Sequence, residues 1–276
     1  MFNKYNLEFQ KIPRRAYSIG STLSEVNQCV QEWKKHLVDK SYTEKQFRIW
    51  IKKELPVHIV FASEYFIGKY PITNAQYQIF LNKSGYETIP ESIQSNEGDD
   101  NPVWGVSIDD AKSCAHWYAK YLGLPLRLPS EYEWEIAARG IERLQYPYGE
   151  TFSSKKGNTY ETGIGHTTPV TLYEQYASPF GVVDMAGNVE EWVDTQYSPY
   201  PGGPNLSDDL SGTLGDNYFV LRGGSFARGG DLSRGARRHG PFPKPEFRYT
   251  GFRLAFGSLD KKFQLEETLL KVISLE

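Results

Sequence analysis

VLRGGSFARGGDLSRGARRHGPFPKPEFRYTGFRLAF, residues 220–256, is the stretch from which the fold of this chain is inferred. Its two ends, VLRGGSF and GFRLAF, have the apolar and aromatic residues of short buried strands. Its middle alternates arginine with glycine and contains no cysteine. Because only Asp231 and Glu246 offset the eight basic residues of this stretch, it carries a local excess of positive charge.

Composition limits the class of protein. With 276 residues, of which 39% are hydrophobic and 14% aromatic, the chain can bury one sizeable core. The 25 glycines and 16 prolines indicate a turn-rich fold. A net charge of −3 gives no general attraction to nucleic acid or to an anionic membrane. We expect neither partner.

The cellular location of the protein is predicted from three features that the sequence lacks. The N-terminus lacks the apolar run of a signal peptide, and no window is long and apolar enough to span a membrane. The two cysteines, Cys29 and Cys114, exclude a disulfide-built scaffold. We therefore expect a cytoplasmic protein.

The first third of the chain mixes strand and helix patterns. Residues 7–21 alternate in polarity and predict a hairpin or an edge strand, and residues 57–67 alternate again. Between them, residues 23–54 have apolar positions at helical spacing and many charges. This pattern predicts two helices inserted between strands.

Three further helices are predicted, each beginning after a capping Ser or Thr and ending at a glycine. They run from Thr73 to Gly85, from Ser107 to Gly123 and from Ser130 to Gly140. Glu133 completes a capping box in the third. Cys114 falls on the apolar face of the second and is expected in the core. Residues 146–256 show no strong helical period and predict loops with short strands.

Four segments, taken in order, resemble the family of the formylglycine-generating enzyme, also called the sulfatase-modifying factor family. They are YFIGKYPITNAQYQIFL (65–81), LPLRLPSEYEWEIAARG (124–140), SPFGVVDMAGNVEEWV (178–193), and LRGGSF with GFRLAF (221–226 and 251–256). Four segments in register are hard to obtain by chance.

The resemblance implies an α+β fold of the C-type-lectin-like kind, irregular and loop-rich, with short antiparallel sheets and a few helices. The domain would span residues 1–256 with the helical insertion at 23–54. Residues 257–276 would form a C-terminal extension, for which a helix is predicted.

The motif DMAGNVEEW, residues 184–192, has the chemistry of a calcium site. Gly187 and Asn188 form a tight turn that presents backbone carbonyls, and Asp184 and Glu191 supply carboxylates close by. Calcium prefers such mixed oxygen ligands.

The family resemblance implies calcium at two places. The ligands implied for the first ion are Asp184, Gly187, Val189 and Glu191. The second ion would lie at Asn158, with Glu161 as a further ligand. The alternative is that these acids pair with the arginines of the same loops, namely Arg222, Arg234 or Arg238.

The copper chemistry of the related enzymes is not expected. In those enzymes two cysteines beyond the GGSF turn bind copper(I), which thiolates select. Here Arg228 stands at the first position, and residues 229–233 shorten the loop that carries the second. Cys29 lies in the insertion and Cys114 in a core helix, so neither replaces them.

A second enzymatic branch resembles the sulfoxide synthases of thiohistidine biosynthesis, which bind iron through histidines of a separate helical domain. The insertion contributes His36 alone, and no two of the five histidines have a helical ligand spacing. Whether this chain is an enzyme therefore stays open at this point.

The basic stretch itself predicts a ligand site. Arg222, Arg234, Arg238 and Arg253 match arginines that the family generally keeps, and we expect them to pair with buried carboxylates. The remaining residues would line a concave site for an anionic or aromatic ligand. They are Arg228, Asp231, Arg237, His239, Phe242, Arg248 and Tyr249. The alternative is a solvated cationic rim with no ligand.

The preferred interpretation is a calcium-stabilised binding or accessory module for a peptide or a small anionic ligand. One alternative is an oxidoreductase that uses another metal or cofactor near His239, Asp231 or Ser233. Another is a variable ligand-binding protein of the kind diversified by retroelements. With each of these, the insertion at 23–54 is a candidate docking element for a partner protein.

Overall fold

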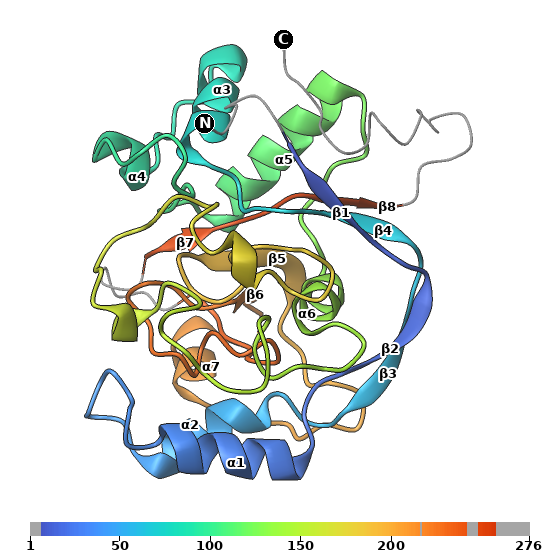
Figure 1. Ribbon diagram of the computed structural model, residues 1–276, viewed down its shortest axis with the longest axis vertical. Coiled ribbons are helices and arrows are strands. Elements are labelled where there is room, and N and C mark those ends of the chain that lie inside the picture. The colour runs from blue at the N-terminus through green and yellow to red at the C-terminus, as the bar shows by residue number, and fades with distance from the viewer. Residues whose placement is uncertain (1–6, 216, 242–247, 258–276) are drawn as a thin grey trace.

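The computed structural model describes residues 7–215, 217–241 and 248–257. One three-stranded sheet joins the two ends of the domain: β1 (Phe9–Ile12), β4 (Tyr65–Gly68) and β8 (Ala255–Gly257) pair antiparallel in that order. Figure 1 shows this sheet beside helix α5. The GFRLAF end of the basic stretch is thus held against the first strands of the domain.

Of the two alternatives predicted for residues 7–21, the hairpin is wrong and the edge strand is confirmed, since β1 lies at an edge of its sheet. β2 (Arg15–Ile19) does not fold back on β1 but pairs antiparallel with β3 (His58–Ala62). The link between β1 and β2 is Pro13-Arg14, which lacks the Gly or Asn that a two-residue hairpin turn needs. The chain therefore continues from one sheet into a second, two-stranded ribbon (Figure 1).

A third sheet carries the motifs of the resemblance. β5 (Glu190–Gln196) lies between β6 (Phe219–Arg222) and β7 (Thr250–Gly251). β5 and β6 are antiparallel, but β5 and β7 are parallel, which corrects the expectation of antiparallel sheets alone. This sheet places β5, which begins within DMAGNVEEW, next to both ends of the basic stretch.

The three capped helices form as predicted. α3 (Asn74–Ser84), α5 (Ile108–Leu122) and α6 (Glu131–Arg139) each begin with a complete capping box. Cys114 is fully buried on α5. α6 packs against β2, β5 and β6, so its acidic side chains reach the interior of the loop-rich half.

The rest of the chain adds short elements. They are α4 (Glu91–Gln94), α7 (Asp209–Leu214), and the 3-10 turns η1 (Tyr160–Thr162) and η2 (Glu174–Tyr176). α7 lies in the region predicted to be loops and strands. Its capping box pairs Asp208 with Ser211, a weaker signal than the usual Glu or Gln at that position. None of the helices in the described ranges is long and apolar enough to cross a membrane.

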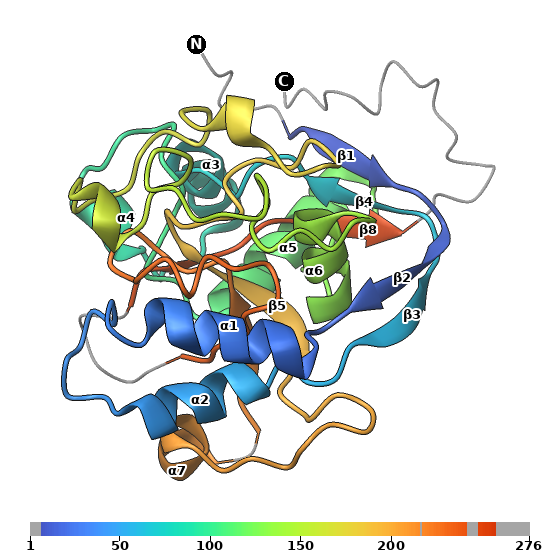
Figure 2. The same ribbon diagram turned by 60° about the horizontal axis from the view of Figure 1, so that its bottom comes forward.

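The predicted insertion consists of α1 (Leu23–Trp33) and α2 (Glu44–Lys52). The two helices share a core of their own, made of Val26, Cys29, Val30, Trp33, Leu37, Phe47 and Ile51. Figure 2 shows both helices along one side of the loop-rich half. Trp33 donates a hydrogen bond from Nε1 to the Tyr146 hydroxyl at 3.1 Å. Partner docking on the outer face of the insertion stays a prediction.

Candidate functional site

The arginines expected to be structural are all buried in ion pairs. Arg222 contacts Glu135 at 2.6 Å and Arg238 contacts Glu131 at 2.7 Å. Both acids come from α6, one turn apart, which places two carboxylates on the same helix face. Pairing with carboxylates is therefore confirmed. Arg222 and Arg238 pair with acids outside the calcium motif, whereas Arg253 pairs with Glu191 of that motif at 2.6 Å.

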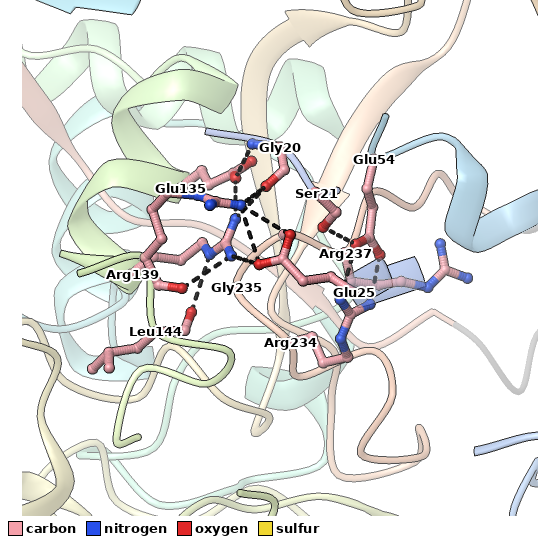
Figure 3. Close-up of polar contacts among 12 residues, drawn as sticks. Gly20, Ser21, Glu25, Glu54, Glu135, Arg139, Leu144, Arg234, Gly235 and Arg237 are labelled. Atoms are coloured by element: carbon pink, nitrogen blue, oxygen red, sulfur yellow. Dashed lines mark hydrogen bonds and ion pairs between the residues drawn. The ribbon is translucent and has the colours of Figure 1, made fainter. Parts of the chain in front are cut away.

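A second group of buried pairs joins the insertion to the domain (Figure 3). Arg234 and Glu54 form two hydrogen bonds, of 2.7 and 3.0 Å, and Ser21 donates to Glu54 at 2.7 Å. In the same view Arg139 donates to Glu135 at 2.9 Å. Burial favours protonation of Glu135, but the Arg222 and Arg139 guanidinium groups outweigh it and lower the pKa to about 2.

A pocket lies where the α1–α2 connection, the start of α7 and residues 227–239 meet. Its volume of about 80 Å³ holds several waters or a small ligand group, since one water needs roughly 10–15 Å³ on this measure. Apolar side chains make much of its wall: Leu37, Val38, Tyr42, Trp50, Leu210, Ala227 and Leu232. The pocket therefore combines an apolar wall, more than half of it from the insertion, with charges of both signs: Lys53, Arg228, Arg237 and Arg238, and Asp39, Asp208, Asp209 and Asp231.

The structure brings Arg228, Asp231, Arg237 and His239 together on this pocket. The Arg237 side chain is only 3% exposed. Its Nη1 donates to the Arg238 carbonyl at 2.5 Å, and its Nε lies 3.7 Å from Asp231 Oδ2 without a hydrogen bond to the described residues. Burial raises the pKa of Asp231 to about 6, against the lowering effect of Arg237.

Glu190 is buried between two of the pocket residues. Its Oε2 accepts from Arg228 Nε at 3.1 Å, and its Oε1 lies 2.8 Å from His239 Nδ1. Burial alone would raise the pKa of Glu190, but Arg228 and His239 hold it near 2. The pKa of His239 is lowered, because burial outweighs the attraction of Glu190. At neutral pH the pair is therefore a carboxylate beside a neutral imidazole.

Two of the predicted residues lie away from the pocket. Arg248 pairs with Glu91, and Tyr249 packs on Trp104 and Phe226 with ring centroids 4.9 and 4.3 Å apart. The third, Phe242, lies outside the described residues. The expected aromatic part of the site is supplied instead by the insertion.

The calcium motif folds into the predicted tight turn. Asp184 and Asn188 both have positive φ, and Gly187 has a φ of 102°. A Cβ at Gly187 would lie 2.1 Å from the Asn158 carbonyl oxygen, so only glycine fits. Asn188 donates to Asp184 Oδ2 at 2.6 Å, while Asp184 Oδ1 is buried without a hydrogen bond to the described residues.

Glu191 does not fit the first calcium site in this arrangement. Its two oxygens accept from Arg253 at 2.6 Å each, and Trp134 Nε1 donates to Oε2 at 2.9 Å. A guanidinium group in this place repels a divalent cation. Asp184, with the carbonyls of Gly187 and Val189, is the part of the predicted ligand set that still fits a cation.

The second calcium ligand set is also engaged within the protein. Asn158 donates to the His166 carbonyl at 2.9 Å. Glu161 accepts from Thr159 Oγ1 at 2.7 Å and from the Gly230 amide at 3.0 Å. Glu161 therefore fixes the loop that carries the pocket residues. Among the described residues, no three His, Cys, Asp or Glu side chains converge on one point.

The two cysteines lie in the core. Burial raises the pKa of Cys29 to about 12 and that of Cys114 well above its usual value. Because the thiolate is the reactive form, neither is suited to copper or to nucleophilic chemistry.

Sequence reasoning missed Glu190, Lys53, Trp50 and Asp208. Lys53 is buried, pairs with Asp208 and donates to the Tyr218 hydroxyl at 2.9 Å. The signal for Glu190 was present: in a strand, neighbouring side chains point to opposite faces, so Glu190 and Glu191 had to meet different partners. The contributions of Lys53 and Trp50 depend on how the insertion packs, which its local pattern does not reveal.

Comparisons with known proteins agree with the fold. A family model described as sulfatase-modifying factor enzyme 1-like domain matches residues 34–257. The chain is 35% identical over 227 residues to the serine/threonine-protein kinase pkn1 of Chlamydia caviae, covering 75% of this chain and 35% of that protein. It is 30% identical over 246 residues to the hercynine oxygenase of Mycobacterium tuberculosis, covering 75% and 56%. The chain thus spans about a third to a half of these relatives.

A structural neighbour supports the same fold class. PvdO from Pseudomonas aeruginosa superposes with a TM-score of 0.64 and 22% identity, covering 91% of this chain and 94% of that one. The similarity supports a C-type-lectin-like α+β fold, with short sheets and few helices.

Proposed function

This chain belongs to the sulfatase-modifying factor enzyme 1-like family, and from that premise we propose that it is a binding module whose pocket takes a small anionic ligand or the acidic end of a peptide. The pocket lies in the loop where the resemblance places the copper-binding cysteines of the related enzymes. Here that loop carries Arg228 and Arg237 instead. Two guanidinium groups thus stand in the loop where the resemblance places soft-metal ligands.

The observation that carries the proposal is the buried Nε of Arg237, which has no hydrogen-bond acceptor among the described residues. A guanidinium normally donates several hydrogen bonds, yet its buried Nε has only the distant Asp231 beside it. A ligand carboxylate or phosphate supplies the acceptor that this group lacks. The apolar wall, with Trp50, then covers the ligand body.

Ligand binding is tested by titrating the protein with small carboxylates, phosphate esters and short acidic peptides while following Trp fluorescence. A Trp50→Phe variant identifies the part of the signal that comes from the pocket. Arg237→Gln is expected to weaken binding roughly 10- to 100-fold, the value of a hydrogen bond to a charged group. Arg248→Gln removes an exposed arginine and is the matched control. Equal affinities of the two variants would refute the proposal.

We also propose that a single calcium ion binds at Asp184. The support is the buried Asp184 Oδ1 without a hydrogen-bond partner among the described residues and the adjoining turn, which only glycine permits at residue 187. Asp184 and the Gly187 and Val189 carbonyls would hold the ion, whose role would be to fix the turn beside β5.

A further inference from the structure

Glu190 and His239 form a pair whose geometry is fixed from both sides. His239 and Leu221 exchange two backbone hydrogen bonds, of 2.9 and 3.2 Å, which fix the main chain of His239 beside the pocket. Glu190 begins β5, is 1% exposed, and is locked by Arg228 on its second oxygen. The 2.8 Å contact between Glu190 Oε1 and His239 Nδ1 is therefore set by the fold.

This contact decides where the proton of the imidazole lies. Arg228 Nε donates to Glu190 Oε2 at 3.1 Å, and a carboxylate held in such an ion pair is an acceptor only, so Nδ1 donates to its other oxygen. Nε2 then carries the free lone pair. The His239 side chain is 13% exposed and lines the pocket, and its Nε2 makes no hydrogen bond within the described part of the chain. A ligand in the pocket meets an oriented, unprotonated base.

We propose that Glu190 and His239 act as a general-base pair that removes a proton from a small anionic substrate, at the carbon next to a carbonyl group. This rests on the proposed anion-binding function of the same pocket. His239 is the catalytic base, and Glu190 is a positioning residue that holds its tautomer.

The lining residues offer a free base but no free nucleophile of the usual kind. The described residues that line the pocket include no Ser, Thr or Cys side chain, and the amine of Lys53, which also lines it, pairs with Asp208 and donates to the Tyr218 hydroxyl. In the proposed step the C–H bond breaks and an Nε2–H bond forms. The electron pair moves to the carbonyl oxygen as an enolate, which the Arg237 guanidinium stabilises. Returning the proton completes the cycle, so no oxidant or reductant is needed.

The first test needs no ligand. Nitrogen-15 NMR of the imidazole rings, with His239 assigned by its loss in His239→Gln, is expected to show Nδ1 protonated and Nε2 unprotonated at pH 7. Glu190→Gln is expected to mix the two tautomers, whereas exposed His116 on α5 keeps its signals in both proteins. An imidazolium, or a proton on Nε2, in the unmodified protein would overturn the proposal.

The second test follows proton exchange in deuterium oxide by proton NMR, with pyruvate, acetoacetate and dihydroxyacetone phosphate as probes. Exchange next to the carbonyl is expected to exceed that in buffer for at least one probe. His239→Gln should lower the rate on the order of 100-fold or more, Glu190→Gln should lower it too, and Arg248→Gln should leave it unchanged.

Binding measured on the same samples distinguishes failure of the general-base role from failure of the binding function. Probes that bind the pocket without exchange overturn the general-base role and leave the binding function in place. No binding by any probe or acidic peptide overturns both. Exchange that persists in His239→Gln assigns the reaction to another group and also overturns the proposal.

Discussion

The buried pair of Glu54 and Arg234 should be the strongest single link between the insertion and the domain. Both side chains are 0% exposed, and two hydrogen bonds join them. Glu54→Gln keeps the shape but leaves the guanidinium without its counter-charge. Breaking a buried pair in this way costs about 3–5 kcal/mol. We expect a loss of that size in the free energy of unfolding, measured by urea denaturation with fluorescence and circular dichroism.

A double variant isolates the charge from the packing. Glu54→Leu with Arg234→Met removes both charges, and we expect it to recover most of the loss, because apolar replacements of buried pairs are often neutral. Glu44→Gln, in an exposed pair with Lys34, is the control and should leave stability unchanged. The reasoning is refuted if Glu54→Gln loses under about 1 kcal/mol, or if the double variant is no more stable than the single one.

Three further predictions concern acid, metal and thiols. Glu135 has a pKa of about 2 in the folded protein against 4.5 in the unfolded chain. This difference stabilises the fold above pH 4.5 by about 3 kcal/mol, and the contribution is lost as the pH falls toward 2. Glu135→Gln should therefore flatten that part of a plot of stability against pH. Calcium should raise the melting temperature at pH 7 and Asp184→Asn should abolish the rise; identical melting in calcium and in a chelator contradicts the site. Cys29 and Cys114 should resist thiol reagents until the protein unfolds, and fast labelling of the folded protein counts against their burial.

Local signals allowed the helices to be predicted from the sequence. Thr73, Ser107 and Ser130 each accept a hydrogen bond from the backbone three residues later, an interaction that depends on a few adjacent residues. Strand pairing was harder, because β1 and β2 are neighbours in sequence but belong to different sheets. Their separation depends on partners from residues 58–68 and from the end of the domain.

The pocket was only partly predictable for the same reason. Four of its residues could be found because Arg228, Asp231, Arg237 and His239 lie within one short stretch of sequence. Their pairing could not be predicted, since Arg228 and His239 contact Glu190, which is 38 and 49 residues away from them in the chain. Arg248 was wrongly predicted to line the pocket, because it is close in sequence to the pocket residues but pairs with Glu91.

Gly230 ties the two halves of the pocket to each other. A Cβ at this position would lie 2.2 Å from Phe152 and 2.6 Å from Trp33, so the loop with the charged groups lies directly against α1. For the ligand that we propose, apolar contacts would come mainly from the insertion and charged contacts mainly from the loop. Substitutions in the α1–α2 connection should therefore change the shape of the apolar wall, and substitutions at Arg228 or Arg237 should change the charge that faces it.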